Sequence, residues 1–227
     1  DLVAVNVSAF DDAMFADALF GHVRGAYTGA ERHRPGLIER AAGGTLFLDE
    51  IGDLSSASQL KLLRLTETGE YLPVGADLPK KSDARIIVAT NRHLGEQVNR
   101  GTFRKDLYYR LRTHHLHLPP LSERKGDLPL LLEHFLDEAA SEMGKGKITY
   151  PPELLTLLRA YHFPGNIREL RALVYDAVSK HRGGVLSTST FRATISPGSP
   201  LPPDPGQPPV RFGESLPTIK QTIELLV

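Results

Sequence analysis

The chain has 227 residues, 41% hydrophobic and 24% charged, so it can bury a substantial core and suits one medium domain or one domain plus a small one. Its 27 basic and 27 acidic residues give a formal net charge of zero, which argues against a generally basic nucleic-acid-binding surface. The absence of cysteine excludes disulfides and thiolate metal sites, and no apolar run approaches the roughly 20 residues that span a bilayer.

The opening residues, DLVAVNVSAF, contain a strand-like run at 2–7 but neither the basic segment nor the cleavage site of a signal peptide. We therefore expect a soluble protein of the cytoplasm with no membrane segment. Because the chain starts without Met inside this run and ends inside a helix-like one, we interpret it as part of a longer protein.

Strand-like and helix-like segments alternate along residues 1–121. Apolar residues at helical spacing predict helices over 11–20 and 57–65. The short, continuously apolar runs at 45–48 and 85–90 are typical of strands buried on both faces of a parallel sheet. This alternation predicts an α/β domain.

After Pro119-Pro120 the pattern becomes helical. An amphipathic segment over 127–142, a helix that Pro151-Pro152 opens and that runs to about residue 161, and a third over 167–180 predict a small all-helical unit over 122–195. Residues 196–209 contain seven prolines, so we expect an extended linker over 196–215.

Two of the predicted strands are followed by polar residues that could bind a metal ion or polarise a water molecule. Asp49-Glu50 ends GGTLFLDE, and Asn91 ends RIIVATN. Ligands of open parallel sheets gather at the carboxyl ends of the strands, where an Asp can hold magnesium through its water shell and a Glu can polarise a water. The alternative is that these residues only begin solvated turns.

Three arginines are candidates for phosphate contact because guanidinium offers a fork of donors. Arg104 and Arg110 are six residues apart and need not share one helical face, and Asp106 offers Arg104 a local partner instead. Arg168 lies in the first turn of a predicted helix, where the dipole disfavours a cation, so an anionic partner is expected, and Glu169 is the simplest one.

These pieces stand in the order of a known family. FGH at 20–22 and GAYTGA at 25–30 resemble the FGHE…GAFTGA signature of sigma-54-dependent transcription activators, a group of AAA+ ATPases. GGTLFLDEIGDL, QLKLLRL, ARIIVATNR, GTFRKDLYYRL, LPPL and FPGNIREL follow in that family's order. The resemblance covers residues 1–195 and implies an AAA+ parallel-sheet core of the P-loop NTPase type over 1–121, followed by a small all-helical lid over 122–195.

The resemblance also implies roles for single residues. Asp49 matches the Walker B Asp that binds magnesium through water, and Glu50 matches the Glu that activates the attacking water. Asn6 matches the Asn that pairs with that Glu, and Asn91 matches the residue called sensor I. The implied cofactors are therefore ATP and Mg²⁺.

The implied partners are other copies of the chain and sigma-54. Arg104 and Arg110 match the arginine fingers, which act on nucleotide bound by the neighbouring subunit, and Arg168 matches sensor II. An arginine supplied in trans can accelerate phosphoryl transfer by about 10³–10⁵-fold, and it requires a homo-oligomer, in this family usually a hexameric ring. The family's loop touches sigma-54, which implies contact by Gly25, Ala26, Tyr27, Thr28, Gly29 and Ala30.

The implied function is ATP-driven remodelling of the sigma-54 RNA polymerase closed complex by a regulator of the kind found in two-component systems. Residues 216–227 resemble the first helix of a Fis-like helix-turn-helix domain, and no recognition helix follows. We therefore expect DNA binding only through a domain that these residues do not complete.

The chain departs from the family at three places. No Walker A motif, G-x-x-x-x-G-K-S/T, occurs in the 227 residues, so we expect the chain by itself to bind ATP poorly and to hydrolyse it negligibly. Val23 stands where the family usually has Glu, so a charged contact at the base of the loop is lost. Tyr27 in place of Phe keeps an aromatic tip.

Two alternatives remain open at this point. Another AAA+ remodeller would share the Asp-Glu pair and the trans arginines but would lack GAYTGA. A non-catalytic module that oligomerises or binds sigma-54 without hydrolysis would fit the absence of Walker A.

Overall fold

The structure, a computed structural model, describes residues 1–195. The chain divides into a first unit, Asp1–Leu116, and a second unit that starts at His117. This division falls shortly before the predicted boundary at residue 121, which stays a prediction. Within the described range, no helix is long and apolar enough to cross a membrane. The linker predicted over 196–215 and the helix predicted over 216–227 lie outside the described residues.

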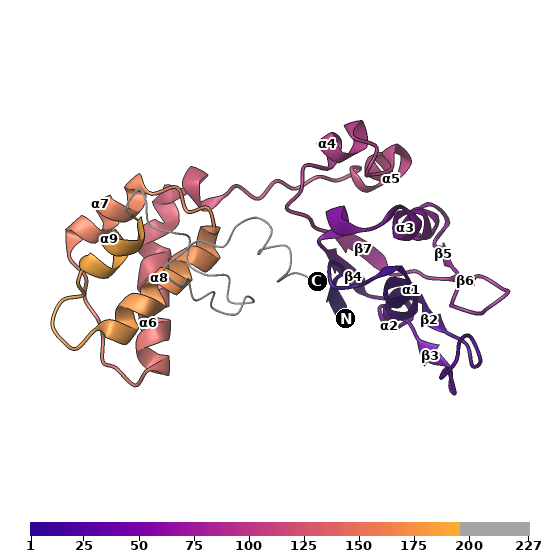
Figure 1. The fold of residues 1–227 in the computed structure, drawn as a ribbon, viewed down its shortest axis with the longest axis horizontal. Helices are drawn as coiled ribbons and strands as arrows, with labels where there is room; N and C mark the ends of the chain where they lie inside the picture. Colours follow the sequence, from indigo (N-terminus) through magenta and orange to yellow (C-terminus); the bar gives the residue numbers. More distant parts are fainter. Residues whose placement is uncertain (196–227) are drawn as a thin grey trace, which may run out of the picture. The chain divides into compact units, whose positions relative to one another are not determined.

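The first unit is built on a three-stranded parallel sheet with β4 in the middle (Figure 1). Its strands are β1 (Leu2–Asn6), β4 (Thr45–Asp49) and β7 (Arg85–Val88), in the order β1-β4-β7. The register places Asn6 beside Asp49, so the carboxyl ends of the strands lie together. The predicted parallel strands and α/β architecture are confirmed.

The sheet is not buried on both faces. Leu46 and Leu48 of β4 are 0% exposed and belong to the core of this unit, together with residues of the surrounding helices. On the opposite face Leu2 is 69% exposed and Ile87 is 38% exposed. The expectation of burial on both faces is therefore wrong at Ile87, in the run at 85–90, because the core lies on only one side of the sheet.

The helices of the first unit begin and end at recognisable signals. Asp11 caps the first one, accepting a hydrogen bond from the backbone N–H of Met14 at 2.8 Å, and Ser55 caps the longest one in the same way. Gly69, with φ 70°, ends that helix in the left-handed conformation. The helices are α1 (Asp12–Phe20), α2 (Leu37–Arg40), α3 (Ser56–Thr68), α4 (Leu94–Asn99) and α5 (Lys105–Leu111).

Two short antiparallel pairs and one 3-10 turn complete the first unit. β2 (Gly21–His22) pairs with β3 (Arg34–Pro35), and β5 (Glu70–Tyr71) pairs with β6 (Lys80–Lys81). A 3-10 turn over Ile51–Asp53 follows β4.

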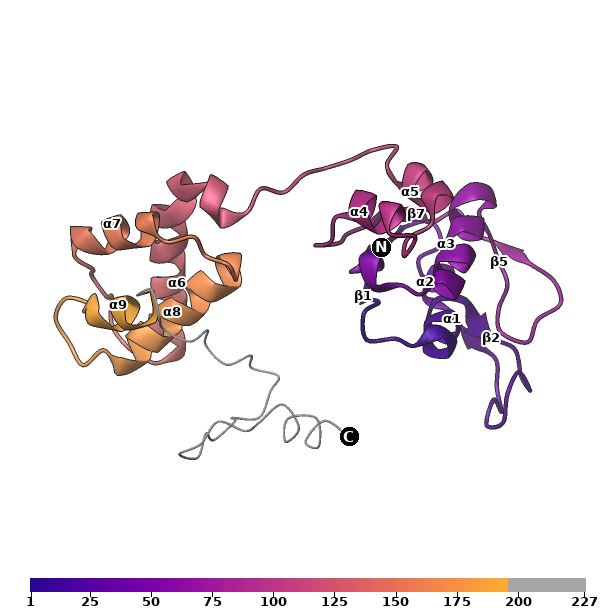
Figure 2. The same ribbon diagram turned by 45° about the horizontal axis from the view of Figure 1, so that its top comes forward.

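The second unit is helical, as predicted. It contains α6 (Leu128–Glu142), α7 (Pro152–Ala160), α8 (Asn166–Lys180) and α9 (Ser189–Ile195), preceded by 3-10 turns over Leu121–Glu123 and Lys125–Asp127. Figure 2 shows α6 and α8 packed side by side, and their apolar faces meet in one core. Proline stands in the first turn of both α6 and α7, where its missing N–H is tolerated.

Candidate functional site

The carboxyl edge of the sheet collects four of the candidate residues. Asn6 ends β1, Asp49 ends β4, Glu50 follows it, and Asn91 lies just beyond β7. The Glu50 carboxylate accepts a hydrogen bond from the backbone N–H of Asn91, with 3.3 Å between Oε2 and the nitrogen. The Asp-Glu pair and Asn91 are therefore adjacent at the ends of two neighbouring strands.

Glu50 has a left-handed backbone, with φ 60° and ψ 40°. This conformation costs a residue with a Cβ roughly 1–3 kcal/mol, so it persists only where the surrounding contacts impose it. The N–H of Glu50 donates to Oδ1 of Asp49 at 3.0 Å, and the N–H of Ile51 donates to the carbonyl of Ala89 at 3.1 Å. These contacts turn the chain sharply out of β4, and the Glu50 carboxylate then meets the chain beyond β7.

Asn6 is not paired with Glu50 in this structure. Its Oδ1 accepts hydrogen bonds from the backbone N–H of Ser8 at 2.9 Å and from the Ser8 hydroxyl at 2.7 Å. The pairing implied by the resemblance is thus not formed here, although Asn6 lies beside Asp49 on the same edge of the sheet.

Asp49 fits a magnesium ion that keeps most of its water shell. One of its carboxylate oxygens accepts the Glu50 N–H, and the other has no hydrogen-bond partner among residues 1–195. In the same range, no group of three or more His, Asp or Glu residues could hold a metal ion by itself. Mg²⁺ typically uses one or two carboxylates together with water and phosphate oxygens, so this donor set suits it better than a cation that needs an all-protein cage.

Arg104 is paired within its own chain. It precedes α5, and its Nε and Nη2 donate to the two carboxylate oxygens of Asp106 at 3.0 Å and 2.6 Å. The hydrogen bond from Arg104 holds the pKa of Asp106 below its usual range, and the same bond raises the pKa of Arg104. The local partner considered for Arg104 is confirmed, and because both side chains are exposed the pair contributes little to stability.

Arg110 makes a different kind of contact. Its Nε donates to the carbonyl of Thr66 at 2.8 Å, in the last turn of α3. The last carbonyls of a helix lack partners within the helix, so an arginine from α5 stabilises the end of α3. The two arginines therefore lie on one short segment but contact different elements.

Gln59 was not singled out from the sequence, yet it joins three segments of the first unit. It is 1% exposed, its Nε2 donates to the carbonyls of Leu54 at 2.8 Å and Thr102 at 3.0 Å, and its Oε1 accepts the N–H of Arg104 at 2.8 Å. It thereby ties the segment after Glu50 to the start of α5. The available signal was a glutamine within the apolar pattern of α3.

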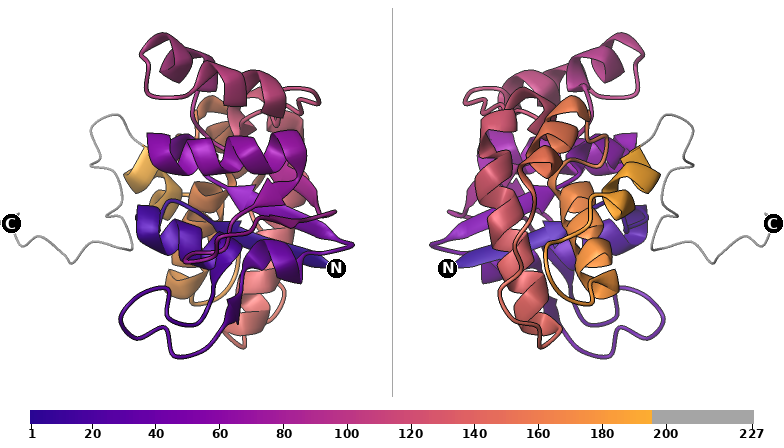
Figure 3. Two further views of the ribbon diagram at one scale, coloured as in Figure 1. Left: turned by 90° about the vertical axis from the view of Figure 1, so that its right-hand side faces the viewer. Right: turned by 90° about the vertical axis from the view of Figure 1, so that its left-hand side faces the viewer.

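The GAYTGA residues form a loop between β2 and β3 that extends away from the sheet (Figures 1 and 3). Gly25 and Gly29 have φ 81° and 98°, in the left-handed region that glycine adopts more readily than other residues. The N–H of Gly25 donates to the carbonyl of Ala30 at 2.8 Å, which closes the loop, while Thr28 at its tip is exposed.

The two ends of this loop are in contact. Gly21 and Gly36 lie where the chain enters and leaves it, and a Cβ on Gly21 would overlap the carbonyl oxygen of Arg34. A Cβ on Gly36 would likewise overlap the carbonyl oxygen of Leu19. The close approach of the two backbones therefore requires glycine at both positions.

The base of the loop contains a polar network around the buried His22 that the sequence did not reveal. Asp17 of α1 accepts hydrogen bonds from Nδ1 of His22 at 2.5 Å and from Nη1 of Arg34 at 2.9 Å. His22 is 7% exposed. Val23 carries no charge, so it makes no charged contact at the base of the loop. The ion pair between Asp17 and Arg34 provides a charged contact there instead.

In the second unit, Arg168 is exposed in the first turn of α8. Glu169 does not pair with it, so that expectation is wrong. The Glu169 carboxylate instead accepts hydrogen bonds from the Tyr161 hydroxyl at 2.7 Å and from the N–H of Gly165 at 2.8 Å. No ion pair or side-chain hydrogen bond of the Arg168 guanidinium is formed within residues 1–195, which leaves its charge available to an external anion.

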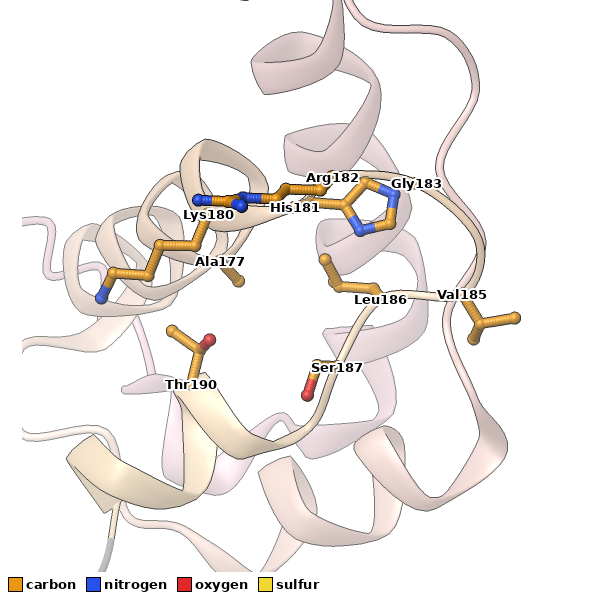
Figure 4. Close-up of a pocket in the computed structure, with 9 residues that line it drawn as sticks. All are labelled: Ala177, Lys180, His181, Arg182, Gly183, Val185, Leu186, Ser187 and Thr190. Atoms are coloured by element: carbon orange, nitrogen blue, oxygen red, sulfur yellow. The ribbon is translucent and has the colours of Figure 1, made fainter.

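A shallow hollow in the second unit contains none of the candidate residues. Figure 4 shows the side chains around it, which come from the end of α8, the following turn and the start of α9. It is open to solvent, and Lys180 on its rim is already paired with Asp176 at 2.8 Å. This hollow therefore plays no part in the candidate site.

Residues 1–117 match the family described as Sigma-54 interaction domain, and residues 122–206 match the AAA+ ATPase lid domain. The chain is 40% identical over 222 residues, 98% of its length, to the DNA-binding transcriptional regulator NtrC of Rhizobium meliloti (strain 1021). It is 42% identical over 212 residues, 93% of its length, to the regulatory protein AtoC of Escherichia coli (strain K12). These matches cover 45% and 44% of the two relatives, so the chain spans less than half of their length.

Among solved structures, the chain is similar to NtrX from Brucella abortus in complex with ATP, with a TM-score of 0.77 and 30% identity over 90% of this chain and 46% of that one. NtrX in complex with ADP gives a TM-score of 0.76 at 30% identity, over 86% of this chain and 43% of that one. This likeness confirms the predicted AAA+ core followed by a helical lid. With fold and sequence in agreement, the chain belongs to the Sigma-54 interaction domain family of transcription regulators.

Proposed function

We propose that this chain is the part of a sigma-54-dependent regulator that hydrolyses ATP and passes the resulting movement to sigma-54. Its action would remodel the closed complex of the sigma-54 RNA polymerase in the cytoplasm. One observation carries the proposal: a single α/β unit presents both an Asp-Glu pair at the edge of its sheet and a projecting GAYTGA loop.

At the sheet edge we assign Glu50 to the attacking water and Asp49 to the water shell of Mg²⁺. Bound magnesium supplies positive charge beside the phosphates. Phosphoryl transfer depends mostly on positioning and charge neutralisation, which a rigid turn can provide. The contact between the Glu50 carboxylate and the N–H of Asn91 supports the assignment of Asn91 to the same water. We assign Asn6 to sensing the state of Glu50.

We assign Arg104 and Arg110 to nucleotide bound by a neighbouring copy of the chain, and Arg168 to phosphate contact. Arg104 already binds both carboxylate oxygens of Asp106, so it must exchange this partner for phosphate oxygens, which the same fork of donors can bind. Arginines that act in trans require a homo-oligomer, for which we propose a hexameric ring. We further propose that DNA is bound by a separate domain.

ATP is the nucleotide we propose, since similar solved structures of NtrX hold ATP and ADP. Residues 1–227 contain no G-x-x-x-x-G-K-S/T, so we expect weak ATP binding and negligible hydrolysis by this chain alone. Calorimetric titration with ATP and a phosphate-release assay measure both. Magnesium-dependent turnover above background by the isolated chain would contradict this expectation.

The full proposal is tested in a chimera in which this chain replaces the matching segment of rhizobial NtrC. The remainder of NtrC then supplies the phosphate-binding loop expected of the family. Glu50→Gln should retain ATP binding and reduce hydrolysis by roughly 10²-fold or more. Thr28→Ala should retain hydrolysis and lose promoter opening with sigma-54 polymerase.

Matched controls lie on α7 of the second unit. Glu153→Gln and Thr156→Ala make the same chemical changes at exposed positions and should alter neither activity. Full hydrolysis by the Glu50→Gln chimera would overturn the active-site assignment. Promoter opening by the Thr28→Ala chimera would overturn the loop assignment and favour another kind of AAA+ remodeller. Sigma-54 binding without hydrolysis by the unmutated chimera would favour a non-catalytic module.

A further inference from the structure

Within the GAYTGA loop, the side chain of Tyr27 contacts His22 at the base of the loop. The ring of Tyr27 meets the imidazole of His22 edge to face, with centroids 5.1 Å apart and an angle of 66° between the planes. About half of Tyr27 is covered, since the residue is 49% exposed. An aromatic pair of this geometry favours the docked arrangement by a factor of roughly two to ten.

The imidazole of His22 can hold the Tyr27 ring in one place because a hydrogen bond to Asp17 fixes the orientation of the imidazole. Its Nδ1 lies 2.5 Å from Oδ1 of Asp17, and a carboxylate only accepts, so Nδ1 carries the hydrogen. The other oxygen of Asp17 accepts from Arg34. Asp17 belongs to α1, His22 precedes the loop and Arg34 follows it, so this network ties both ends of the loop to one helix.

His22 contacts mainly the aromatic ring of Tyr27 and only weakly its hydroxyl. The hydroxyl lies 3.4 Å from Nδ1 of His22, but the hydrogen on that nitrogen points to the much closer Asp17. At this distance the hydroxyl contact is weak. A phenylalanine at this position should therefore dock nearly as well as the tyrosine does.

We propose that His22, oriented by Asp17, holds Tyr27 in its docked position, and that Tyr27 must leave His22 before the tip can engage sigma-54 fully. The proposal rests on the proposed role of the loop. While Tyr27 is docked, one side of its ring is unavailable to a partner. The apparent affinity for sigma-54 is then lowered by the fraction of molecules in which the ring is free.

The test uses the 227-residue chain with ¹³C-labelled tyrosine rings, whose NMR signals report docking without any partner. The Tyr27 signal is assigned by its loss in Tyr27→Phe. In His22→Gln, which can still donate to Asp17 but has no ring, the Tyr27 signal should move towards that of free tyrosine. His33→Gln is the matched control, an exposed histidine just outside the hexapeptide, and should leave the signal unchanged.

Titration of the same samples with purified sigma-54 tests the functional half. His22→Gln should bind roughly two- to ten-fold more tightly than the unmutated chain, and Tyr27→Phe should bind within about two-fold of it. If His22→Gln fails to fold, Arg34→Gln provides a second test, because Arg34 is exposed and its loss should loosen the network around His22 in the same direction.

The outcomes separate the two ideas. An unchanged Tyr27 signal in a folded His22→Gln or Arg34→Gln chain, or weaker sigma-54 binding by a folded His22→Gln chain, would overturn the proposal that His22 restrains Tyr27. Sigma-54 binding that Thr28→Ala leaves intact would instead contradict the proposed loop contact, whatever the ring signal shows. Complete absence of titration by the unmutated chain would count against both.

Discussion

Gln59→Leu should destabilise the first unit by roughly 2–4 kcal/mol. The substitution leaves the Leu54 carbonyl without its partner in a buried position, and it removes partners from the Thr102 carbonyl and the Arg104 N–H in partly buried ones. A buried group left unpaired costs about 1–3 kcal/mol, whereas partly buried groups recruit water and cost less. Leucine recovers some of the loss through its apolar side chain.

Gln97→Leu is the matched comparison, because the chemical change is the same and the residue lies in the neighbouring α4. The Gln97 side chain donates a hydrogen bond from Nε2 to the carbonyl of Gly52 at 3.1 Å, and its Oε1 is buried without a partner among residues 1–195. Leucine removes that unpaired oxygen along with the bond. The net change should therefore stay within about 1 kcal/mol.

Urea unfolding of the chain, followed by amide hydrogen exchange, measures both variants. The transition of the first unit gives the free energy of unfolding, and exchange at the Arg104 amide reports the local bond directly. In Gln59→Leu this amide should exchange faster than its neighbours in α5. Equal losses of stability in the two variants, or an Arg104 amide that keeps its protection, would refute the reasoning.

Three further predictions concern charged and titrating side chains. Burial, and after it the hydrogen bond to Glu169, raises the pKa of Tyr161 to about 12. The stability that this raised pKa contributes is complete below pH 10 and should be lost as the pH rises towards 12. Tyr161→Phe should therefore lose less stability over this pH range than the unmutated chain, as measured by circular dichroism. Arg110→Gln should increase amide exchange in the last turn of α3 and lower stability by about 1 kcal/mol; unchanged exchange there would contradict the capping role. Arg104→Ala should move the carboxyl titration of Asp106 upwards in NMR, since the arginine is the main cause of its lowered pKa.

The elements that the sequence predicted well are those with many periodic apolar residues. The segment predicted at 167–180 became α8 (Asn166–Lys180), and the apolar run at 45–48 became β4. The helix predicted over 57–65 continues to Thr68, because polar residues extend it after the apolar pattern stops and Gly69 ends it. Short helices such as α2, with only four residues, show too little periodicity to be predicted.

Contacts between distant residues could not be predicted from one sequence. Arg104 and Gln59 are 45 residues apart, and Arg110 and Thr66 are 44 apart, so no local pattern pairs them. Asp49, Glu50 and Asn91 were identified as candidate site residues because each stands at or just beyond the end of a predicted strand and matches a motif of the family. Their closeness follows from the parallel pairing of β4 with β7, and the apolar runs did indicate parallel strands.

The contact of Gly21 with the chain around Gly36 has a consequence for protein engineering. Because the loop leaves and rejoins the fold at one place, it behaves geometrically as an insertion: the core on either side is continuous without it. Replacing the loop with a tight turn should therefore keep the fold of the first unit and remove the proposed sigma-54 contact. The same residues, joined end to end, could serve as a cyclic peptide that competes with the whole protein, because its termini already meet.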